Sequence, residues 1–359
     1  MNTLATALGC ALFLTTTRGE VVTLTHPAAT LPPNRTVVWS PVFQAAWDQL
    51  NTRLGGPPVR VEPPNALMAM LDAFRWEPGK VMPVGSWKAW CGPATHDFLK
   101  QVNREAAAIT KEPEGPFILL QESSGSLAFF SILDRTVEFQ RAFFRSSKIP
   151  LKFRASDGEH PVQFFGVRDD AGEGFGDSVR ILAWRPIDRS HAIQIRCKQA
   201  DDTVILYLPA QNQDFATACH WLRTWRAQSK PDAQRSGAWN DGTFHTGDEI
   251  QIPFVTLESR ANLTPLFGGV RYHGKKGKPE IPWNITRVEQ LTRFELHENG
   301  ARVRVEVSGE AAFGPGPPPT VPRRFLYDRP FFVFLWREQA EWPYFAAWIG
   351  DGSALKAFP

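Results

Sequence analysis

Residues 325–352 read FLYDRPFFVFLWREQAEWPYFAAWIGDG and hold two apolar runs close together. The runs at 331–336 and 344–350 are continuous in apolar and aromatic side chains, which is typical of strands buried on both faces. The charged stretch between them ends in Trp342-Pro343 and predicts a connection instead of a strand. The C-terminal segment therefore predicts two strands.

Strands dominate the final third of the chain, and helices are expected mainly before it. Ser40-Pro41 predicts a helix start, with Ser40 as the N-cap and Pro41 at the first helical position. Thr95 predicts the start of another helix, with Asp97 in its first turn. The sequence has no internal repeat, so we expect one α+β domain. Further helices are expected at 65–75 and 215–228, and further strands at 127–133, 161–167, 179–184, 192–198, 203–209, 250–257 and 286–296.

Composition excludes some classes of protein. The chain of 359 residues is 43% hydrophobic and 21% charged, as globular proteins are, with 30 prolines and 27 glycines that favour many strands and loops. A net charge of +3, with basic and acidic residues mixed, gives no reason to expect a nucleic-acid partner. No apolar run reaches the length of about 18 residues that a membrane span needs, so no membrane partner is expected.

The N-terminal residues allow two interpretations. Residues 1–19 are either a secretory signal segment or a short first helix, and residues 20–359 form the domain. We expect a secreted or periplasmic protein, with a cytoplasmic one as the alternative. The four cysteines lack the spacing of a metal site or a disulfide framework, which predicts free thiols. They are Cys10, Cys91, Cys197 and Cys219.

Three short motifs resemble active-site patterns and lack an essential residue. Trp90-Cys91-Gly92-Pro93 has Ala94 where a redox site needs its second cysteine, so Cys91 is expected in a loop. Residues 269–276 resemble a phosphate loop but end in Lys276, and are expected to be an exposed basic loop. No two histidines are three to five residues apart, and no serine lies in a nucleophile elbow. We expect no catalytic residues, no metal site and no cofactor, so an enzyme with a scattered triad is the weakest hypothesis.

Residues 297–324 combine two incompatible patterns. His297–Val307, HENGARVRVEV, begins with a turn at Gly300 and continues with strict alternation of small or apolar and charged residues. The alternation predicts a strand with one buried face, yet SGEAAFGPGPPPTVP follows at 308–322 and cannot continue a sheet. One interpretation is a permanent strand at 301–307.

The order of these elements resembles the serpins along most of the chain. Residues 37–50, VVWSPVFQAAWDQL, are similar to the family's strand and helix built on a Ser-Pro pair, and residues 131–144, SILDRTVEFQRAFF, to its Asn-Ala…Trp-x-x-x-Phe strand. Asp328-Arg329-Pro330-Phe331 resembles the family's buried Asp-His-Pro-Phe strand. The resemblance implies a serpin-like α+β single domain with a large central mixed sheet, two smaller sheets, several helices and an exposed reactive loop.

Two departures from the family pattern bear on function. The interval from Ser40 to Asn103 is shorter than in typical serpins, which removes the usual site for polysaccharide activators, so no such cofactor is expected. Phe43 and Gln290 lie near positions where the family has a small polar residue and a histidine under the opening region of the sheet.

The resemblance implies a function for the alternating segment. It matches Glu298, Asn299, Gly300 and Ala301 to the serpin hinge, so the hinge and reactive loop span about 298–324. In serpins a protease cleaves this loop, which then inserts as an extra strand and traps the enzyme. The family's loop length places the reactive bond at Gly314-Pro315, and Phe313-Gly314 suits a chymotrypsin-like pocket better because cleavage before proline is poor. Arg323-Arg324 lies too far from the hinge.

Two hypotheses follow for the serpin-like chain. The first is a monomeric inhibitor of a chymotrypsin- or elastase-like serine protease, acting by loop cleavage and insertion. Val303, Val305 and Val307 are stiff at χ1 and should slow this insertion. The alternative is a non-inhibitory serpin-like scaffold or binding protein whose loop does not trap proteases.

Overall fold

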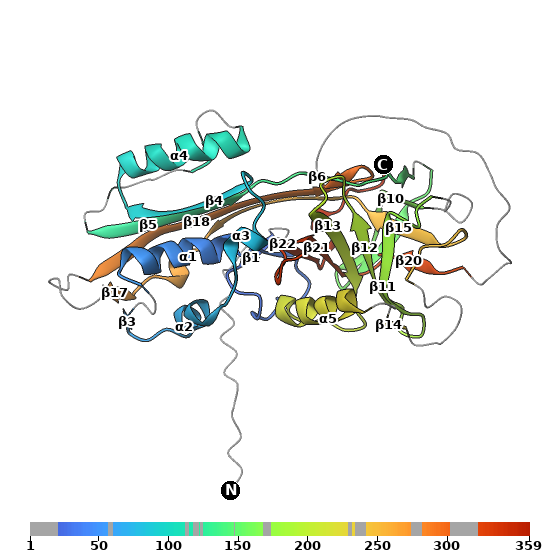
Figure 1. Cartoon of the computed structure of the whole chain (residues 1–359), viewed down its shortest axis with the longest axis horizontal. Coiled ribbons are helices and arrows are strands. Elements are labelled where there is room, and N and C mark those ends of the chain that lie inside the picture. Colours follow the sequence, from blue (N-terminus) through green and yellow to red (C-terminus); the bar gives the residue numbers. More distant parts are fainter. Residues whose placement is uncertain are drawn as a thin grey trace, which may run out of the picture.

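The computed structural model describes most of the chain, and its strands form three main sheets (Figure 1). Every structural statement below concerns the described residues. They are 21–56, 60–111, 115–117, 122, 125–146, 148–167, 174–228, 232–233, 242–273, 282–301 and 322–359.

The six-stranded sheet is built around two parallel strands, β5 and β18. Their eight registered pairs run from Ser126 with Asn284 to Leu133 with Thr292. All the other pairings in this sheet are antiparallel, so the sheet is mixed. Its strands are β3 (Arg60–Glu62), β17 (Arg271–His273), β18 (Trp283–Leu296), β5 (Ser126–Leu133) and β4 (Trp87–Pro93), with β16 (Val255–Asn262) also paired to β18.

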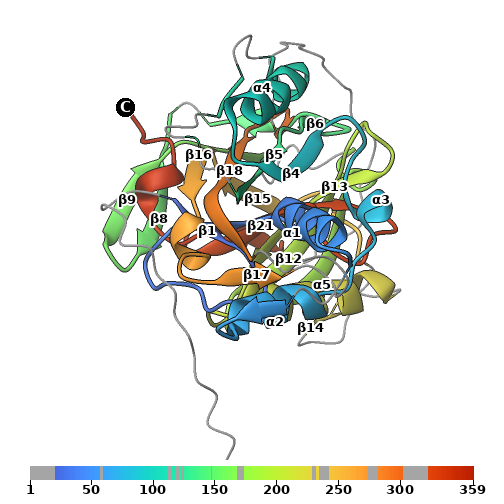
Figure 2. The same cartoon turned by 90° about the vertical axis from the view of Figure 1, so that its left-hand side faces the viewer.

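Helices cover both faces of this sheet (Figure 2). Helix α4 (His96–Thr110) connects β4 to β5 and packs Val102 and Ala106 against Phe130. Helix α1 (Val42–Arg53) packs Phe43 and Trp47 on the opposite face. Because successive side chains of a strand point to opposite faces, a strand between two helices has no side chain that faces solvent and is mostly apolar. This explains why every residue of β5, SLAFFSIL, is buried.

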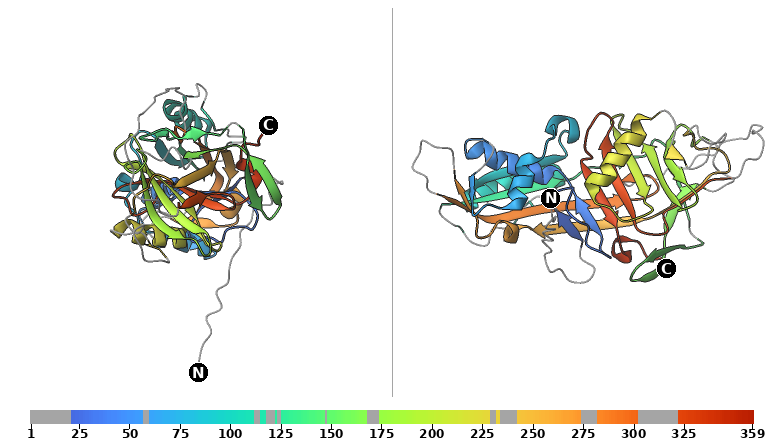
Figure 3. Two further views of the ribbon diagram at one scale, coloured as in Figure 1. Left: turned by 90° about the vertical axis from the view of Figure 1, so that its right-hand side faces the viewer. Right: turned by 90° about the horizontal axis from the view of Figure 1, so that it is seen from below.

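The eight-stranded sheet contains the two strands predicted from the apolar runs at 331–336 and 344–350. Strands β21 and β22 pair antiparallel from Phe331 with Ile349 to Leu335 with Phe345. Helix α5 (Phe215–Ala227) lies along one face of this sheet, where Phe215 contacts Phe332 (Figure 3). The strand order is β1 (Val22–Leu24), β2 (Val37–Trp39), β22 (Phe345–Ile349), β21 (Phe331–Arg337), β13 (Asp202–Leu208), β12 (Ser190–Arg196), β11 (Val179–Arg185) and β14 (Asp232–Ala233).

A third sheet and two short ribbons complete the strands. The four-stranded sheet has the order β20 (Arg324–Leu326), β15 (Glu249–Pro253), β10 (Phe164–Val167) and β7 (Phe144–Arg145). The ribbons pair β19 (Gly300–Ala301) with β6 (Val137–Glu138), and β8 (Leu151–Ala155) with β9 (Gly158–Val162). The remaining helical segments are α2 (Ala66–Ala73), α3 (Pro78–Val81), η1 (Thr264–Leu266) and η2 (Gly352–Ala354). None of the helices in the described ranges combines the length and apolar character needed to cross a bilayer.

Several local expectations need correction. Helix α1 begins at Val42 with Pro41 as its N-cap residue, one position later than expected, although the Ser40 hydroxyl does accept from the Val42 N–H at 3.3 Å as a cap would, and it also donates to the Tyr344 carbonyl at 2.7 Å. Cys91 lies in strand β4 instead of a loop, and burial raises the pKa of its thiol to about 12, which makes it unreactive. The strands expected at 161–167 and 250–257 are each interrupted once, at Gln163 and Phe254.

Other expectations are confirmed or fall outside the described residues. Thr95 caps α4, accepting from the Phe98 N–H at 3.2 Å. Cys91, Cys197 and Cys219 are free. Residues 1–19, which include Cys10, lie outside the described part of the chain. The expected basic loop at 269–276 contains strand β17, and its residues after His273 also lie outside the description.

A buried ion pair joins the segment before β20 to the four-stranded sheet. Arg323 and Asp248 both have fully buried side chains, and the guanidinium donates to Asp248 Oδ2 at 2.6 Å. The Arg323 N–H donates to Asp248 Oδ1 at 2.9 Å. One residue further along each segment, Arg324 and Glu249 form a similar pair at 2.7 Å, with Arg324 mostly exposed to solvent.

These neighbouring pairs give a matched test of burial. Asp248→Asn removes the carboxylate charge that pairs with the buried Arg323 guanidinium, and we expect the free energy of unfolding to fall by about 3–5 kcal/mol. Glu249→Gln breaks the exposed pair and should cost less than about 1 kcal/mol. Urea unfolding of both variants measures the difference, and equal losses would contradict the role assigned to burial.

Candidate functional site

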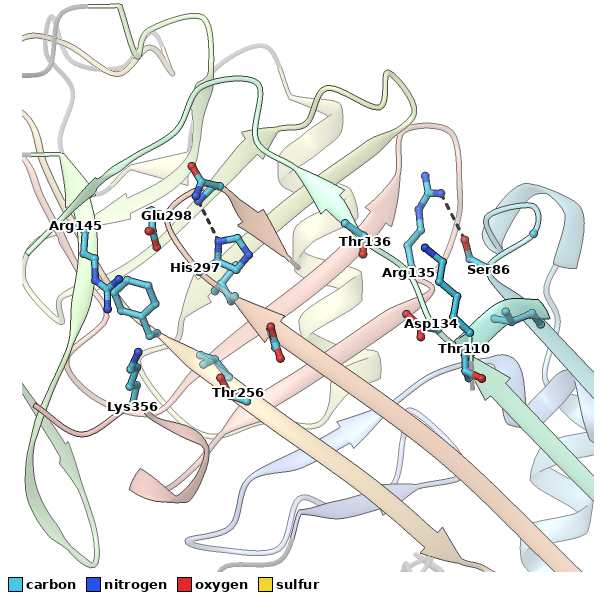
Figure 4. A pocket seen from close by; sticks show the side chains of 18 of the residues that line it. Ser86, Thr110, Asp134, Arg135, Thr136, Arg145, Thr256, His297, Glu298 and Lys356 are labelled. Carbon is cyan, nitrogen blue, oxygen red and sulfur yellow. Dashed lines mark hydrogen bonds between the residues drawn. The ribbon is translucent and has the colours of Figure 1, made fainter. Parts of the chain in front are cut away.

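A cavity lies where the two central strands separate. The parallel pairing of β5 and β18 ends at Leu133 with Thr292, and beyond it β18 continues to Leu296 paired only with β16. A cavity of about 980 Å³ occupies this place (Figure 4). Its lining comes from three places: the residues after β5 (Asp134, Arg135 and Thr136), the end of β18 and the turn after it (Glu295, Leu296, His297, Glu298 and Asn299), and the end of α4 (Thr110 and Lys111).

The expected hinge residues form a tight turn at the edge of this cavity. The backbone reverses between His297 and Gly300, whose N–H and carbonyl groups are bonded to each other at 2.9 and 3.1 Å. The Asn299 N–H donates to His297 Nδ1 at 3.2 Å. Gly300 has φ +145°, a conformation that residues with a side chain rarely adopt. Glycine at this position is therefore required by the turn.

The turn is bonded to the segment that follows β5. Strand β19 pairs with β6, and the carbonyls of Glu298 and Asn299 accept from the N–H groups of Phe143 and Phe139, each at 2.8 Å. A Cβ atom added to Gly300 would lie 2.2 Å from the Val137 carbonyl oxygen. The beginning of the expected loop is thus held against the 137–143 segment in this state.

His297 takes part in the turn as a neutral imidazole. Its Nδ1 accepts a hydrogen bond, which a protonated ring could not do. Burial lowers the pKa of His297 below 6.5, while the charges of Glu298 and Glu295 act in the opposite direction. The turn is therefore coupled to protonation at mildly acidic pH.

Three of the four cations that line the cavity, Arg135, Arg145 and Lys356, are engaged with other groups. Arg135 forms an ion pair with Asp202 at the start of β13, and its Nε donates to Asp202 Oδ2 at 3.2 Å. The Arg145 guanidinium lies over the Phe254 ring, 5.0 Å from its centroid, and Lys356 lies 6.0 Å from the same centroid. Arg135 thus ties the end of β5 to the eight-stranded sheet.

Aromatic side chains fill the space under the paired strands. Phe43 of α1 lies 5.9 Å from Phe129 of β5 and 5.8 Å from Phe267, measured between ring centroids. Gln290 of β18 is fully buried opposite Ser131, and its amide donates to Thr292 Oγ1 at 3.1 Å. The two departures noted in the sequence therefore lie in the packing beneath the β5–β18 pair.

The arrangement suits a strand better than a small substrate. A chain that reverses after β18 would run antiparallel to both β18 and β5. Antiparallel ladders are slightly more stable per residue than parallel ones, so replacing one parallel ladder by two antiparallel ones is favourable. Within the described ranges, no three histidine, cysteine, aspartate or glutamate side chains come together as a metal site.

The fold is that of a known family. No protein-family model matches the sequence, and no curated protein matches it. Among solved structures, the native state of tengpin, a thermophilic serpin, aligns with a TM-score of 0.55 at 10% identity over 89% of each chain. The chain has the serpin fold. Thyroxine-binding globulin in complex with thyroxine aligns with a TM-score of 0.51 at 10% identity, covering 89% of this chain and 94% of that one.

The described residues include the hinge of the predicted reactive loop but not its reactive bond. Phe313, Gly314 and Pro315, the expected reactive bond, lie outside the described residues and remain a sequence-based prediction. Glu298–Ala301 lie at the end of β18, in the turn described above. Sequence reasoning missed the bonds of His297 and the burial of Arg323, because both depend on partners distant in sequence or on the turn geometry.

Replacing Gly300 tests the turn. Gly300→Ala places its Cβ against the Val137 carbonyl and imposes an unfavourable φ, so we expect a loss of about 2 kcal/mol in unfolding free energy. Gly269→Ala is the control, because Gly269 also has positive φ but open space around it, and should cost about 1 kcal/mol. Urea unfolding gives both values, and a smaller loss at Gly300 than at Gly269 would contradict the close packing.

Acidification should loosen the same turn. The pKa of His297 in the folded protein lies below its usual value of 6.5. The stabilisation that neutral His297 gives the turn is therefore fully present above pH 6.5 and is lost as the pH falls toward the folded-state pKa. We expect the Asn299 amide to lose protection against hydrogen exchange between pH 7.5 and 5.5, after correction for intrinsic rates. His297→Gln keeps a side-chain acceptor that does not titrate. Equal pH dependence of this protection in the His297→Gln variant and the unchanged protein would contradict the role of His297 protonation.

Proposed function

We propose that this protein inhibits a chymotrypsin- or elastase-like serine protease, by cleavage of the loop after Gly300 and insertion of that loop between β5 and β18. The main observation behind this proposal is that β5 and β18 pair directly and in parallel. If they separated, one strand antiparallel to both could pair with them. The hinge residues follow β18 without interruption, so the loop begins at the end of the strand beside which it would insert.

The length of the alternating segment supports the proposal. An inserted strand has to replace eight registered pairs between β5 and β18, a distance of roughly 25 Å at about 3.3 Å per residue. Residues 301–311 alternate over eleven positions and lie before Phe313-Gly314. Cleavage there would leave a strand long enough to fill the sheet. On this proposal the protein is a monomer, is secreted or periplasmic, and is not an enzyme.

A non-inhibitory role is favoured by a different observation. The hinge is bonded to the 137–143 segment, and Phe43 fills the space beneath the paired strands. Both features raise the cost of separating β5 from β18, which would make the loop a substrate instead of a trap.

Incubation with chymotrypsin and with elastase separates the two roles. Inhibition predicts a covalent complex that resists denaturing electrophoresis, with the cut at Phe313-Gly314 by mass spectrometry. Loop cleavage without complex, while the protease keeps full activity, would leave only the scaffold role. A melt of the cleaved protein adds an independent measure, because insertion should raise the melting temperature and a loop that stays outside should not change it.

Loop stiffness can be tested within the same assay. Val303→Ala with Val305→Ala removes two β-branched side chains, and we expect faster insertion and a larger fraction of covalent complex relative to cleaved product. Val84→Ala is the control, because Val84 is 89% exposed and distant in sequence. An unchanged partition in the double variant would show that insertion is limited by the sheet and not by the loop.

A further inference from the structure

A second cavity lies on the eight-stranded sheet, at the C-terminal end of α5. Its volume is about 600 Å³, and strands β11, β12 and β13 all contribute to its lining. The carbonyl of Gln228, the residue that ends α5, accepts from Arg180 Nη2 at 2.6 Å. The charged side chains of the lining are Arg180, Arg196, Lys198, Asp202 and Glu338.

The two acids of the lining are neutralised by cations that do not line the cavity. Asp202 forms its ion pair with Arg135, and Glu338 forms one with Arg226 at 3.5 Å. The Arg226 side chain is only 10% exposed, so this second pair is largely withdrawn from water. The two acids are therefore already balanced and do not neutralise the cations of the lining.

Two guanidinium groups of the lining have no counter-charge among the described residues. Lys198 is paired with Glu138 at 2.8 Å, but Arg180 donates only to the neutral Gln228 carbonyl. The guanidinium of Arg196 has no hydrogen bond or ion pair with any described residue, and its side chain is exposed. Because a guanidinium carries five N–H donors, most donors of this pair of arginines are available to a ligand.

The two arginines lie close together on one face of the sheet. Arg180 is registered with Gln194, and Arg196 is two residues further along β12, so the arginines are diagonal neighbours on the same face. Gln194 and Thr203, which also line the cavity, are only 5% and 4% exposed. The guanidinium groups therefore lie beside a floor that is withdrawn from water, where charges are screened less than in bulk solvent.

The charge of Arg180 acts on a neighbouring cation. Burial lowers the pKa of Arg226, the pair with Glu338 raises it, and the charge of Arg180 lowers it again. Two like charges thus oppose each other at the end of α5. An anion bound at Arg180 would reduce this repulsion.

We propose that this cavity binds a phosphate group, as the free ion or as part of a small phosphate monoester, between the guanidinium groups of Arg180 and Arg196. Each guanidinium can donate two parallel N–H bonds, and a tetrahedral phosphate offers separate oxygens to two such groups, whereas a carboxylate has only two oxygens. The volume of the cavity leaves room for the organic part of a monoester. The proposal is independent of protease inhibition, because neither the hinge nor the loop lines this cavity.

Calorimetry with glucose 6-phosphate, inorganic phosphate, succinate and glucose tests the proposal on the full chain. At pH 7.5 the phosphate ester carries close to two negative charges, so succinate matches it in charge and glucose matches it in size. We expect saturable binding of phosphate that is stronger than that of succinate or glucose. Tighter binding of the ester than of inorganic phosphate would assign the ester as the ligand, and equal binding would assign the free ion. Absence of saturable phosphate binding, or equal binding of succinate or glucose, would overturn the proposal.

Substitutions assign the binding to named residues. Arg196→Gln should weaken phosphate binding by about tenfold or more, the scale of one charge-assisted hydrogen bond. Arg104→Gln makes the same change at an exposed side chain of α4 and should leave binding unchanged. Adding Arg180→Gln to Arg196→Gln should abolish saturable binding. Since Arg196 is exposed, its variant should melt at the same temperature as the unchanged protein. Equal phosphate affinity of the Arg196→Gln and Arg104→Gln variants would overturn the proposal.

Discussion

The parallel ladder between β5 and β18 is the constraint on which the rest of the structure depends. It closes the six-stranded sheet over eight registered pairs, and its end defines the position of the cavity and the hinge turn. All of β5 and the central residues 288–292 of β18 are buried between α1 and α4, so the two strands cannot separate there without disturbing helix packing. The energy needed to open the sheet is therefore set by the side chains above and below it as well as by the ladder.

The two ends of the expected loop are held by different kinds of interaction. The first end is a turn of backbone hydrogen bonds around Gly300, sensitive to side-chain volume and to the protonation of His297. The second end is the buried Arg323–Asp248 pair, whose partners leave water together and satisfy each other. The first anchor can open locally, whereas the second requires a charge to become unpaired. Release of the loop is thus expected from the hinge side. Burial of Arg323 also removes it as a protease recognition site in this state.

Sequence patterns predicted the elements whose periodicity is set by burial. The apolar run of β5, the Thr95 cap of α4 and the strands β21 and β22 were predictable because neighbouring residues determine them. The positions that could not be predicted depend on distant partners. Ser40 bonds to Tyr344, Arg323 to Asp248, and Arg135 to Asp202, and nothing in the local sequence distinguishes these side chains from solvated ones. The hinge was placed by resemblance, but its turn depends on contacts with residues 137–143 that no local pattern encodes.

Helix α1 holds the sheet closed from beneath through two kinds of contact. Trp47 is fully buried in the aromatic packing beneath β5, 6.2 Å from Phe267, and its indole N–H also donates to Asp72 of α2 at 2.8 Å. Phe43, one turn earlier on the same helix, contacts Phe129 of β5. A shift of α1 would therefore disturb the aromatic packing and the Trp47–Asp72 hydrogen bond together. Since β5 cannot move away from β18 without changing its contact with α1, the polar contacts of α1 also oppose opening of the sheet.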